Sequence, residues 1–151
     1  YLLISFWSSK PEARAGARVL VGEVGALAWG LLDFEIIDSS GINSPGAYAA
    51  RLRDRRRLQA AGMAPGPEGS AQWVRELIAE THPDYIVSLE RFLHLRTIRE
   101  ESDFRSQYEL ARVFRIPPGD EVLVFRRLHD GGETAPVTAT RPSVTISRSP
   151  K

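Results

Sequence analysis

Short apolar runs that alternate with helix-length segments are the feature that most limits how this chain can fold. Arg18 to Glu23 and Phe34 to Asp38 are rich in β-branched residues, which is the pattern of buried strands. Asp84 to Leu89 is a third run of the same kind, and longer segments separate it from the second. This alternation favours strands and helices that pack in layers around one sheet.

Two helices are predicted between the second and third strands. Ser44 is a suitable N-cap and Pro45 suits the first helical position, so a helix is expected from Gly46 to Ala61. Ser70 is placed to cap a second helix, Ala71 to Glu80. This helix has one apolar stripe, made of Trp73, Val74, Leu77 and Ile78. The segment Phe92 to Phe104 is also expected to be helical.

The C-terminal strands complete the predicted fold. Tyr108 to Ile116 and Glu121 to Leu128 flank a Pro-Pro-Gly-Asp turn, which predicts an antiparallel hairpin. We therefore expect an α/β fold, a three-layer sandwich with a mostly parallel sheet and a C-terminal antiparallel hairpin. Residues 17–128 would form the single α/β domain. Residues 1–16 are predicted to be a lead-in or the stub of a preceding membrane helix, and residues 129–151 a flexible tail.

Composition excludes several kinds of site. The chain contains no cysteine, which rules out disulfides and thiolate metal sites. The net charge is +1 and aromatic residues are not clustered, so nucleic acid is not an expected partner. Histidines 82, 94 and 129 lack metal-ligand spacing, and neither a metal nor a cofactor is expected. Gly22 and Gly25 give only G-x-x-G, which is not the dinucleotide fingerprint.

Acidic residues follow each of the three predicted parallel strands. Glu23, Asp38 (with Ser39 beside it) and Glu90 would meet at one sheet edge, where α/β folds bind ligands. Such carboxylates are suited to bind a cation or sugar hydroxyls, or to act as an acid/base pair. The alternative is that they cap helical turns and accept hydrogen bonds from loop amides.

The densest cluster of charge is RLRDRRR, residues 51–57. Arg51, Arg55 and Arg56 are candidates for binding a phosphate or an anionic headgroup. The alternative is a solvated helix face, because the arginines fan around the helix and Asp54 interrupts them.

The stretch VLVGEVGALAWGLLDFEIIDSSGINSP resembles a motif of bacterial polytopic membrane glycosyltransferases. It is similar to the soluble C-terminal region of these enzymes, which are of the GT-C type and related to protein mannosyltransferases and aminoarabinose transferases. The matching residues are Gly22, Glu23, Val24, Gly25, Ala26, Leu27, Asp38, Gly41, Ile42, Ser44 and Pro45. HPDYIVSLE, FRSQYELARVFRI and EVLVFRR follow in the family's order, so the resemblance covers Ala17 to Arg127. The segment Trp29 to Leu32 departs from it.

The resemblance implies an extracytoplasmic, non-catalytic accessory domain of a membrane glycosyltransferase that uses a lipid-phosphate sugar donor. Its partner would be the membrane-embedded remainder of the same polypeptide, at the cell membrane, and it would contact lipid-linked sugar or acceptor glycan. The catalytic acid of such enzymes lies between membrane helices, so no catalytic residue is predicted here.

Two other functions remain open from the residues. One is a free-standing α/β ligand-binding module or enzyme that uses Glu23, Asp38 and Glu90. The other is an interaction domain whose Arg51 to Arg57 helix docks on an anionic membrane.

Overall fold

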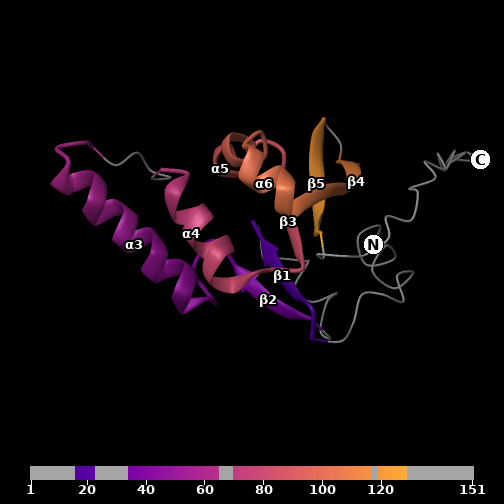
Figure 1. The fold of residues 1–151 in the computed structure, drawn as a ribbon, viewed down its shortest axis with the longest axis horizontal. Helices are drawn as coiled ribbons and strands as arrows, with labels where there is room; N and C mark the ends of the chain where they lie inside the picture. Colours follow the sequence, from indigo (N-terminus) through magenta and orange to yellow (C-terminus); the bar gives the residue numbers. More distant parts are fainter. Residues whose placement is uncertain (1–15, 23–33, 65–69, 117–118, 129–151) are drawn as a thin grey trace, which may run out of the picture.

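The computed structural model describes residues 16–22, 34–64, 70–116 and 119–128 (Figure 1). The strands are β1 (Arg18–Val21), β2 (Glu35–Asp38), β3 (Tyr85–Leu89), β4 (Tyr108–Ile116) and β5 (Asp120–Arg127). The helices are α3 (Pro45–Ala60), α4 (Gln72–Thr81), α5 (Leu93–Ile98) and α6 (Ser102–Gln107). The predicted tail and residues 1–15 of the predicted lead-in lie outside the described residues.

The strands form one mixed sheet in the order β2-β1-β3-β5-β4. β1 pairs in parallel with both β2 and β3, whereas β3–β5 and β5–β4 are antiparallel. The expected hairpin is confirmed, but the expectation of a mostly parallel sheet was wrong. The parallel strands have only four or five residues, whereas β4 and β5, joined by a tight turn, have nine and eight. The antiparallel ladders are therefore the longer ones.

Edge strand β4 contains a β-bulge. Its register with β5 shifts between Leu110 and Arg112, so that two residues of β4 advance against one of β5. Leu110 is about half exposed, and Arg112 and Arg115 are also exposed.

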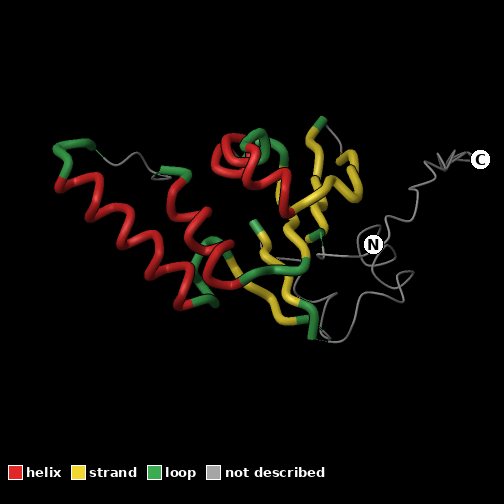
Figure 2. The backbone as a smooth tube through the Cα atoms, in the orientation of Figure 1, coloured by secondary structure: helices red, strands yellow, loops and turns green. Residues whose placement is uncertain are grey.

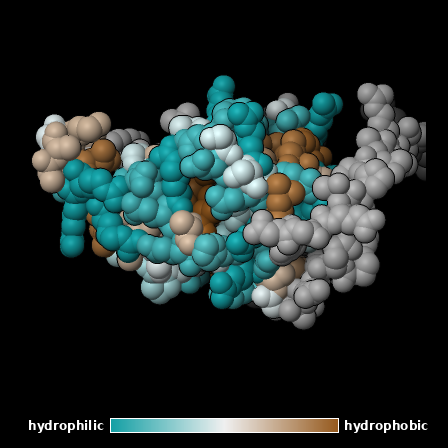
Figure 3. Space-filling view, viewed as in Figure 1, coloured by the Kyte–Doolittle hydropathy of each residue, from teal (hydrophilic) through white to brown (hydrophobic). Residues whose placement is uncertain are grey.

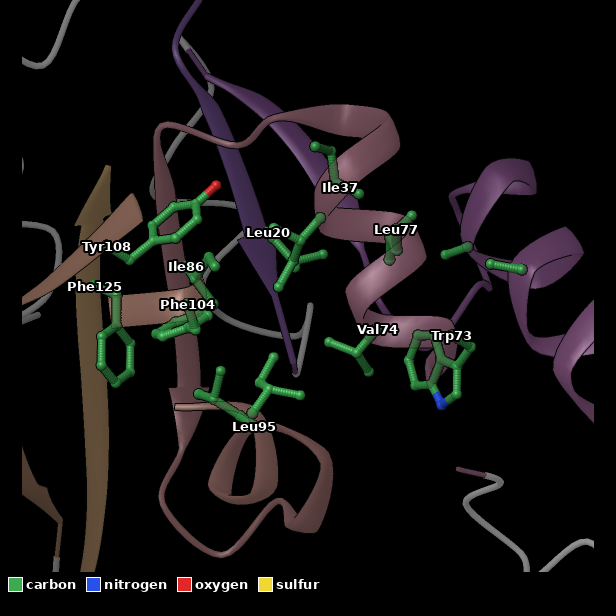
Figure 4. Packing of buried hydrophobic residues seen from close by; sticks show 14 of the residues in the cluster. Leu20, Ile37, Trp73, Val74, Leu77, Ile86, Leu95, Phe104, Tyr108 and Phe125 are labelled. Carbon is green, nitrogen blue, oxygen red and sulfur yellow. The ribbon is translucent and has the colours of Figure 1, made fainter. Parts of the chain in front are cut away.

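All described helices pack on one face of the sheet (Figure 2). The cluster between them comprises Leu20, Ile37, Ala47, Ala50, Trp73, Val74, Leu77, Ile78, Ile86, Leu95, Ile98, Phe104, Tyr108, Leu123 and Phe125 (Figure 4). The opposite face buries Val19, Val21, Tyr85, Val87, Leu89, Val122 and Val124. No described helix contributes to this second cluster. The described helices therefore form one layer on one side of the sheet, whereas the expected sandwich has a helical layer on each side.

The inner strands of the sheet contribute side chains alternately to the two clusters. In β1, Leu20 belongs to the helix-covered face, while Val19 and Val21 belong to the other. Successive side chains of a strand point to opposite faces, so runs that are apolar throughout bury both. The predicted apolar stripe of α4 is confirmed, because all four of its residues are buried.

The end of α4 is anchored to the start of β4. His82 has a left-handed backbone (φ 46°) and ends the helix just before Pro83. The hydroxyl of Tyr108 donates a hydrogen bond to the Pro83 carbonyl oxygen at 2.9 Å. Burial raises the pKa of Tyr108 to about 12, so the phenol stays protonated and keeps this donor.

Among the described helices, none is both long enough and apolar enough to cross a bilayer.

A buried aspartate ties α3 to the start of α4. The carboxylate of Asp54 accepts hydrogen bonds from the Ser70 backbone N–H at 2.8 Å and from the Ser70 hydroxyl at 2.6 Å. Arg57 and Arg53 extend the contact between the helices through Glu76 and Glu80. Ala71 occupies the N-cap position that was predicted for Ser70, but the Ser70 oxygen still accepts a hydrogen bond from the Gln72 N–H at 3.2 Å.

We predict that Asp54→Ala lowers the free energy of unfolding by about 2 kcal/mol, because it leaves two partly buried donors of Ser70 without an acceptor. Urea denaturation followed by circular dichroism measures the change. Asp103→Ala is the control, because Asp103 is exposed and its loss should cost at most about 0.5 kcal/mol. Equal effects of the two substitutions would contradict the structural role of Asp54.

Candidate functional site

A cavity of about 170 Å³ lies at the carboxyl ends of β1, β2 and β3. Because the three strands are parallel, these ends meet at one edge of the sheet, where α/β folds form ligand sites. The cavity is lined by Leu20, Gly22, Ser39, Ser40, Arg51, Trp73, Val74, Ile86, Val87, Ser88, Phe92, His94 and Leu95. Figure 4 shows Trp73, Val74 and Leu95 at one end of the buried cluster.

Gly22 keeps the inner part of this cavity open. Its N–H donates a hydrogen bond to the Val87 carbonyl at 3.0 Å, which holds the residue against β3. A Cβ atom at this position would lie 3.0 Å from the Ser88 oxygen and 3.2 Å from the Phe92 ring. Any side chain here would therefore have to displace a cavity wall.

Asp38 shapes the loop at the cavity rim. Its buried carboxylate accepts hydrogen bonds from the Ser40 N–H at 2.8 Å, the Ser40 hydroxyl at 2.5 Å and the Asn43 N–H at 3.0 Å. Burial acts to raise the pKa of Asp38, but the hydrogen bonds from Ser40, Asn43 and Ile42 outweigh it and hold the pKa below its usual value. The carboxylate therefore stays charged and occupied by its own loop.

Ser44 has a different role from the predicted one. Its hydroxyl makes no capping bond to α3, although the residue stands at the N-cap position. The Ser44 Oγ instead accepts a hydrogen bond from the Asp38 N–H at 2.7 Å. Both ends of the β2–α3 loop are thus joined through Asp38.

Of the three predicted carboxylates, Asp38 and Glu90 belong to the described residues. Glu90 follows β3, where its N–H bonds the Glu121 carbonyl and its side chain accepts a hydrogen bond from Arg99 at 3.2 Å. β1 separates the strand that ends at Asp38 from the strand before Glu90, and neither acid lines the cavity. Glu23 lies outside the described residues. Within the described ranges, no three His, Asp or Glu residues are grouped to hold a metal.

The three arginines proposed from the sequence separate into two groups. Arg51 points to the cavity, where it donates a hydrogen bond to the Ser40 carbonyl at 3.0 Å and lies 5.3 Å from the centre of the Trp73 ring. Arg55 and Arg56 are exposed and form no ion pair within the described part of the chain. The cavity arginine therefore has a fixed position, whereas the other two face solvent.

Sequence reasoning missed the aromatic wall of the cavity. Trp73 was assigned to the apolar stripe of α4, and it is buried, but its ring also meets His94 edge to face at 5.2 Å. The signal available in the sequence was Arg51 on the preceding helix, because a cation stacks favourably on an indole ring. The contact depends on how α3, α4 and α5 pack, which the sequence pattern does not specify.

The polar groups that line the cavity suit an anion. Among the described lining residues they comprise the hydroxyls of Ser39, Ser40 and Ser88, the guanidinium of Arg51 and the imidazole of His94, and none of these residues is Asp or Glu. The Ser40 hydroxyl is already donated to Asp38, whereas the Ser39 hydroxyl makes no hydrogen bond to another described residue. Together with the apolar walls, these groups favour a small molecule that has a negative group beside a ring.

The sequence profile of a family described as "Domain of unknown function (DUF8728)" matches residues 7–138, so the chain belongs to this family. No curated protein and no solved structure shows a significant match to the chain. The family description names no activity, and the cavity is therefore the basis for a functional proposal.

We predict that Asp38→Asn destabilises the protein by about 2 kcal/mol at pH 7, because an amide cannot accept all the hydrogen bonds of the carboxylate. Since the pKa of Asp38 is lowered on folding, its contribution is present above the unfolded pKa, near 3.9, and is lost as the pH falls through the folded value. The difference from wild type should shrink at about pH 2, measured by urea denaturation. An unchanged difference at both pH values would show that the charge of Asp38 does not matter.

Proposed function

We propose that this member of the DUF8728 family is a non-catalytic domain that binds a small anionic ligand. We further propose that it is the extracytoplasmic accessory domain of a membrane glycosyltransferase that uses a lipid-phosphate sugar donor. The observation that carries the proposal is the cavity at the ends of β1, β2 and β3, in which Arg51 is held between the Ser40 carbonyl and the Trp73 ring.

The dimensions of the cavity favour a small ligand or one part of a larger one. Pockets for drug-sized molecules have volumes of about 300 to 1,000 Å³. The cavity here has about 170 Å³ and combines one cation with an indole wall. A phosphorylated sugar matches this arrangement, because a phosphate pairs with a guanidinium and the sugar ring can pack against Trp73.

The motif residues that resemble the transferases give this cavity its shape. Gly22 leaves room between β1 and Phe92, and Asp38 organises the loop that presents Ser39 and Ser40. The resemblance and the cavity thus depend on the same residues. An accessory domain beside an enzyme of lipid-phosphate sugars would meet ligands of this chemistry, either on the lipid-linked donor or on the acceptor glycan.

The environment of the acidic residues supports a binding role over a catalytic one. Asp38 has its carboxylate bonded within its own loop, and Glu90 pairs with Arg99 outside the cavity. The alternative of a free-standing enzyme would require acids aimed at a ligand. The described residues provide an arginine and hydroxyls instead.

We predict that a hexose 1-phosphate binds in the cavity and that Arg51→Gln weakens this binding at least about ten-fold, because a charge-assisted hydrogen bond contributes about 1.5 to 3 kcal/mol. Titration followed by amide NMR shifts measures the affinity, with inorganic phosphate and the free hexose as comparisons. Arg55→Gln is the matched control, because it removes the same charge from the exposed side of the same helix. Equal weakening by both variants, or the absence of binding, would overturn the proposed pocket.

The place of the domain in a glycosyltransferase needs a separate test on the complete gene product. Arg51→Gln should raise the KM for the lipid-linked donor or the acceptor while kcat stays near its wild-type value, because the residue binds and does not react. Arg105→Gln, which removes an exposed arginine on α6 away from the cavity, should leave both constants unchanged. A complete gene product that neither resides in the membrane nor transfers sugar would overturn the transferase assignment, even if the isolated chain binds a sugar phosphate.

A further inference from the structure

Helix α3 has an outward side with an unusual mixture of residues. Ala47, Ala50 and Asp54 are the buried residues of the helix. On the opposite side, helical spacing aligns Tyr48, Leu52, Arg55 and Arg56. We call these four residues, together with Ile42 before the helix and Met63 after it, the outer surface of α3.

Large apolar side chains are exposed along this surface. Ile42 is 85% exposed, Tyr48 56% and Met63 58%, which are the highest values among the large apolar residues described. Figure 3 shows apolar surface beside hydrophilic surface at the end of the molecule where α3 ends in Figure 1. Ile42 and Tyr48 lie at the start of α3 and Met63 lies beyond its end, so exposed apolar side chains, which mark interaction sites when they form patches, occur at both ends of the helix.

The unpaired positive charge of α3 lies on the same surface. Arg53 and Arg57, on the side toward α4, pair with Glu80 and Glu76. Arg55 and Arg56 have no acidic partner in the described ranges and extend into solvent. The outer surface of α3 therefore combines two uncompensated cations with three exposed apolar side chains.

We infer that the outer surface of α3 docks on an anionic lipid bilayer. Arginines near such a surface pair with headgroup phosphates, and each strengthens binding about five-fold. Tyrosine and aliphatic side chains between them enter the boundary between headgroups and acyl chains, which is the arrangement of an interfacial helix. A nucleic acid or another soluble polyanion would satisfy the arginines but leave Ile42, Tyr48 and Met63 in water.

The docking surface adjoins the proposed ligand cavity. Ser39 and Ser40 line the cavity, and Ile42 follows them in the same loop. Gly41 packs closely against the first turns of α3, where an added Cβ would lie 3.0 Å from the Tyr48 nitrogen. A docked domain would thus hold the cavity rim near the headgroups. The inference itself does not depend on the proposed function, because lipid binding requires neither a pocket ligand nor a transferase.

Vesicle co-sedimentation of the 151-residue chain tests the inference. Vesicles that contain phosphatidylglycerol should bind the protein in low salt, whereas pure phosphatidylcholine vesicles should bind it far less, and the difference should fall in high salt. The double substitution Arg55→Gln with Arg56→Gln should weaken binding about twenty-five-fold, the product of two five-fold effects. Arg53→Gln with Arg57→Gln is the matched control, because it changes the net charge equally on the paired side of the helix and should retain most of the binding.

A second pair of substitutions tests the apolar contribution without changing charge. Ile42→Ser with Tyr48→Ser should weaken vesicle binding while circular dichroism shows an unchanged fold, since both side chains are exposed. Equal losses in the two arginine double variants would overturn the inference by showing that only net charge matters. Failure to bind either vesicle would also overturn it, as would double-stranded DNA that binds as tightly as the vesicles and is unaffected by the serine substitutions.

Discussion

The carboxylate of Asp38 holds the loop on which the arrangement of the ligand cavity depends. It is buried at the end of β2 and accepts hydrogen bonds from Ser40 and Asn43, while its own N–H bonds the Ser44 hydroxyl. These bonds fix where α3 begins relative to the sheet. The position of α3 then sets Arg51 against Trp73, and it directs Arg55 to the opposite side of the helix. One buried charge thus determines both the polar wall of the cavity and the outward surface of α3.

The strands and the hairpin were predictable, because short sequence patterns determine them. The β-branched runs became β1, β2 and β3, and the turn between residues 116 and 120 gave the expected hairpin. The balance of parallel and antiparallel pairing was not predictable in the same way. β5 buries Val122 and Val124 on one face and Leu123 and Phe125 on the other, a pattern that suits a strand of either direction. The pairing of β5 with β3 depends on contacts between residues far apart in the sequence, and the local sequence pattern does not specify it.

The candidate site shows the same division between local and long-range information. The sequence placed Asp38 and Glu90 at strand ends correctly, but it could not show that β1 lies between their strands or that each has a partner nearby. It marked Arg51, Arg55 and Arg56 as one group. Their separation follows from the 100° step between helical residues and from the side on which α4 packs. The contact between Trp73 and His94 joins α4 and α5, and the spacing of these residues in the sequence does not predict it.

The bulge in β4 has a consequence for how copies of the protein behave at high concentration. A regular edge strand offers its free amides and carbonyls to any passing chain, and edge-to-edge pairing of this kind starts aggregation. In β4 the register breaks between Leu110 and Arg112, and the arginines at 112 and 115 project near the break. The bulge and the charged side chains beside it disfavour the addition of a second chain to the ladder past that point. The exposed leucine and valine of this edge are thereby kept from acting as a template for fibrils.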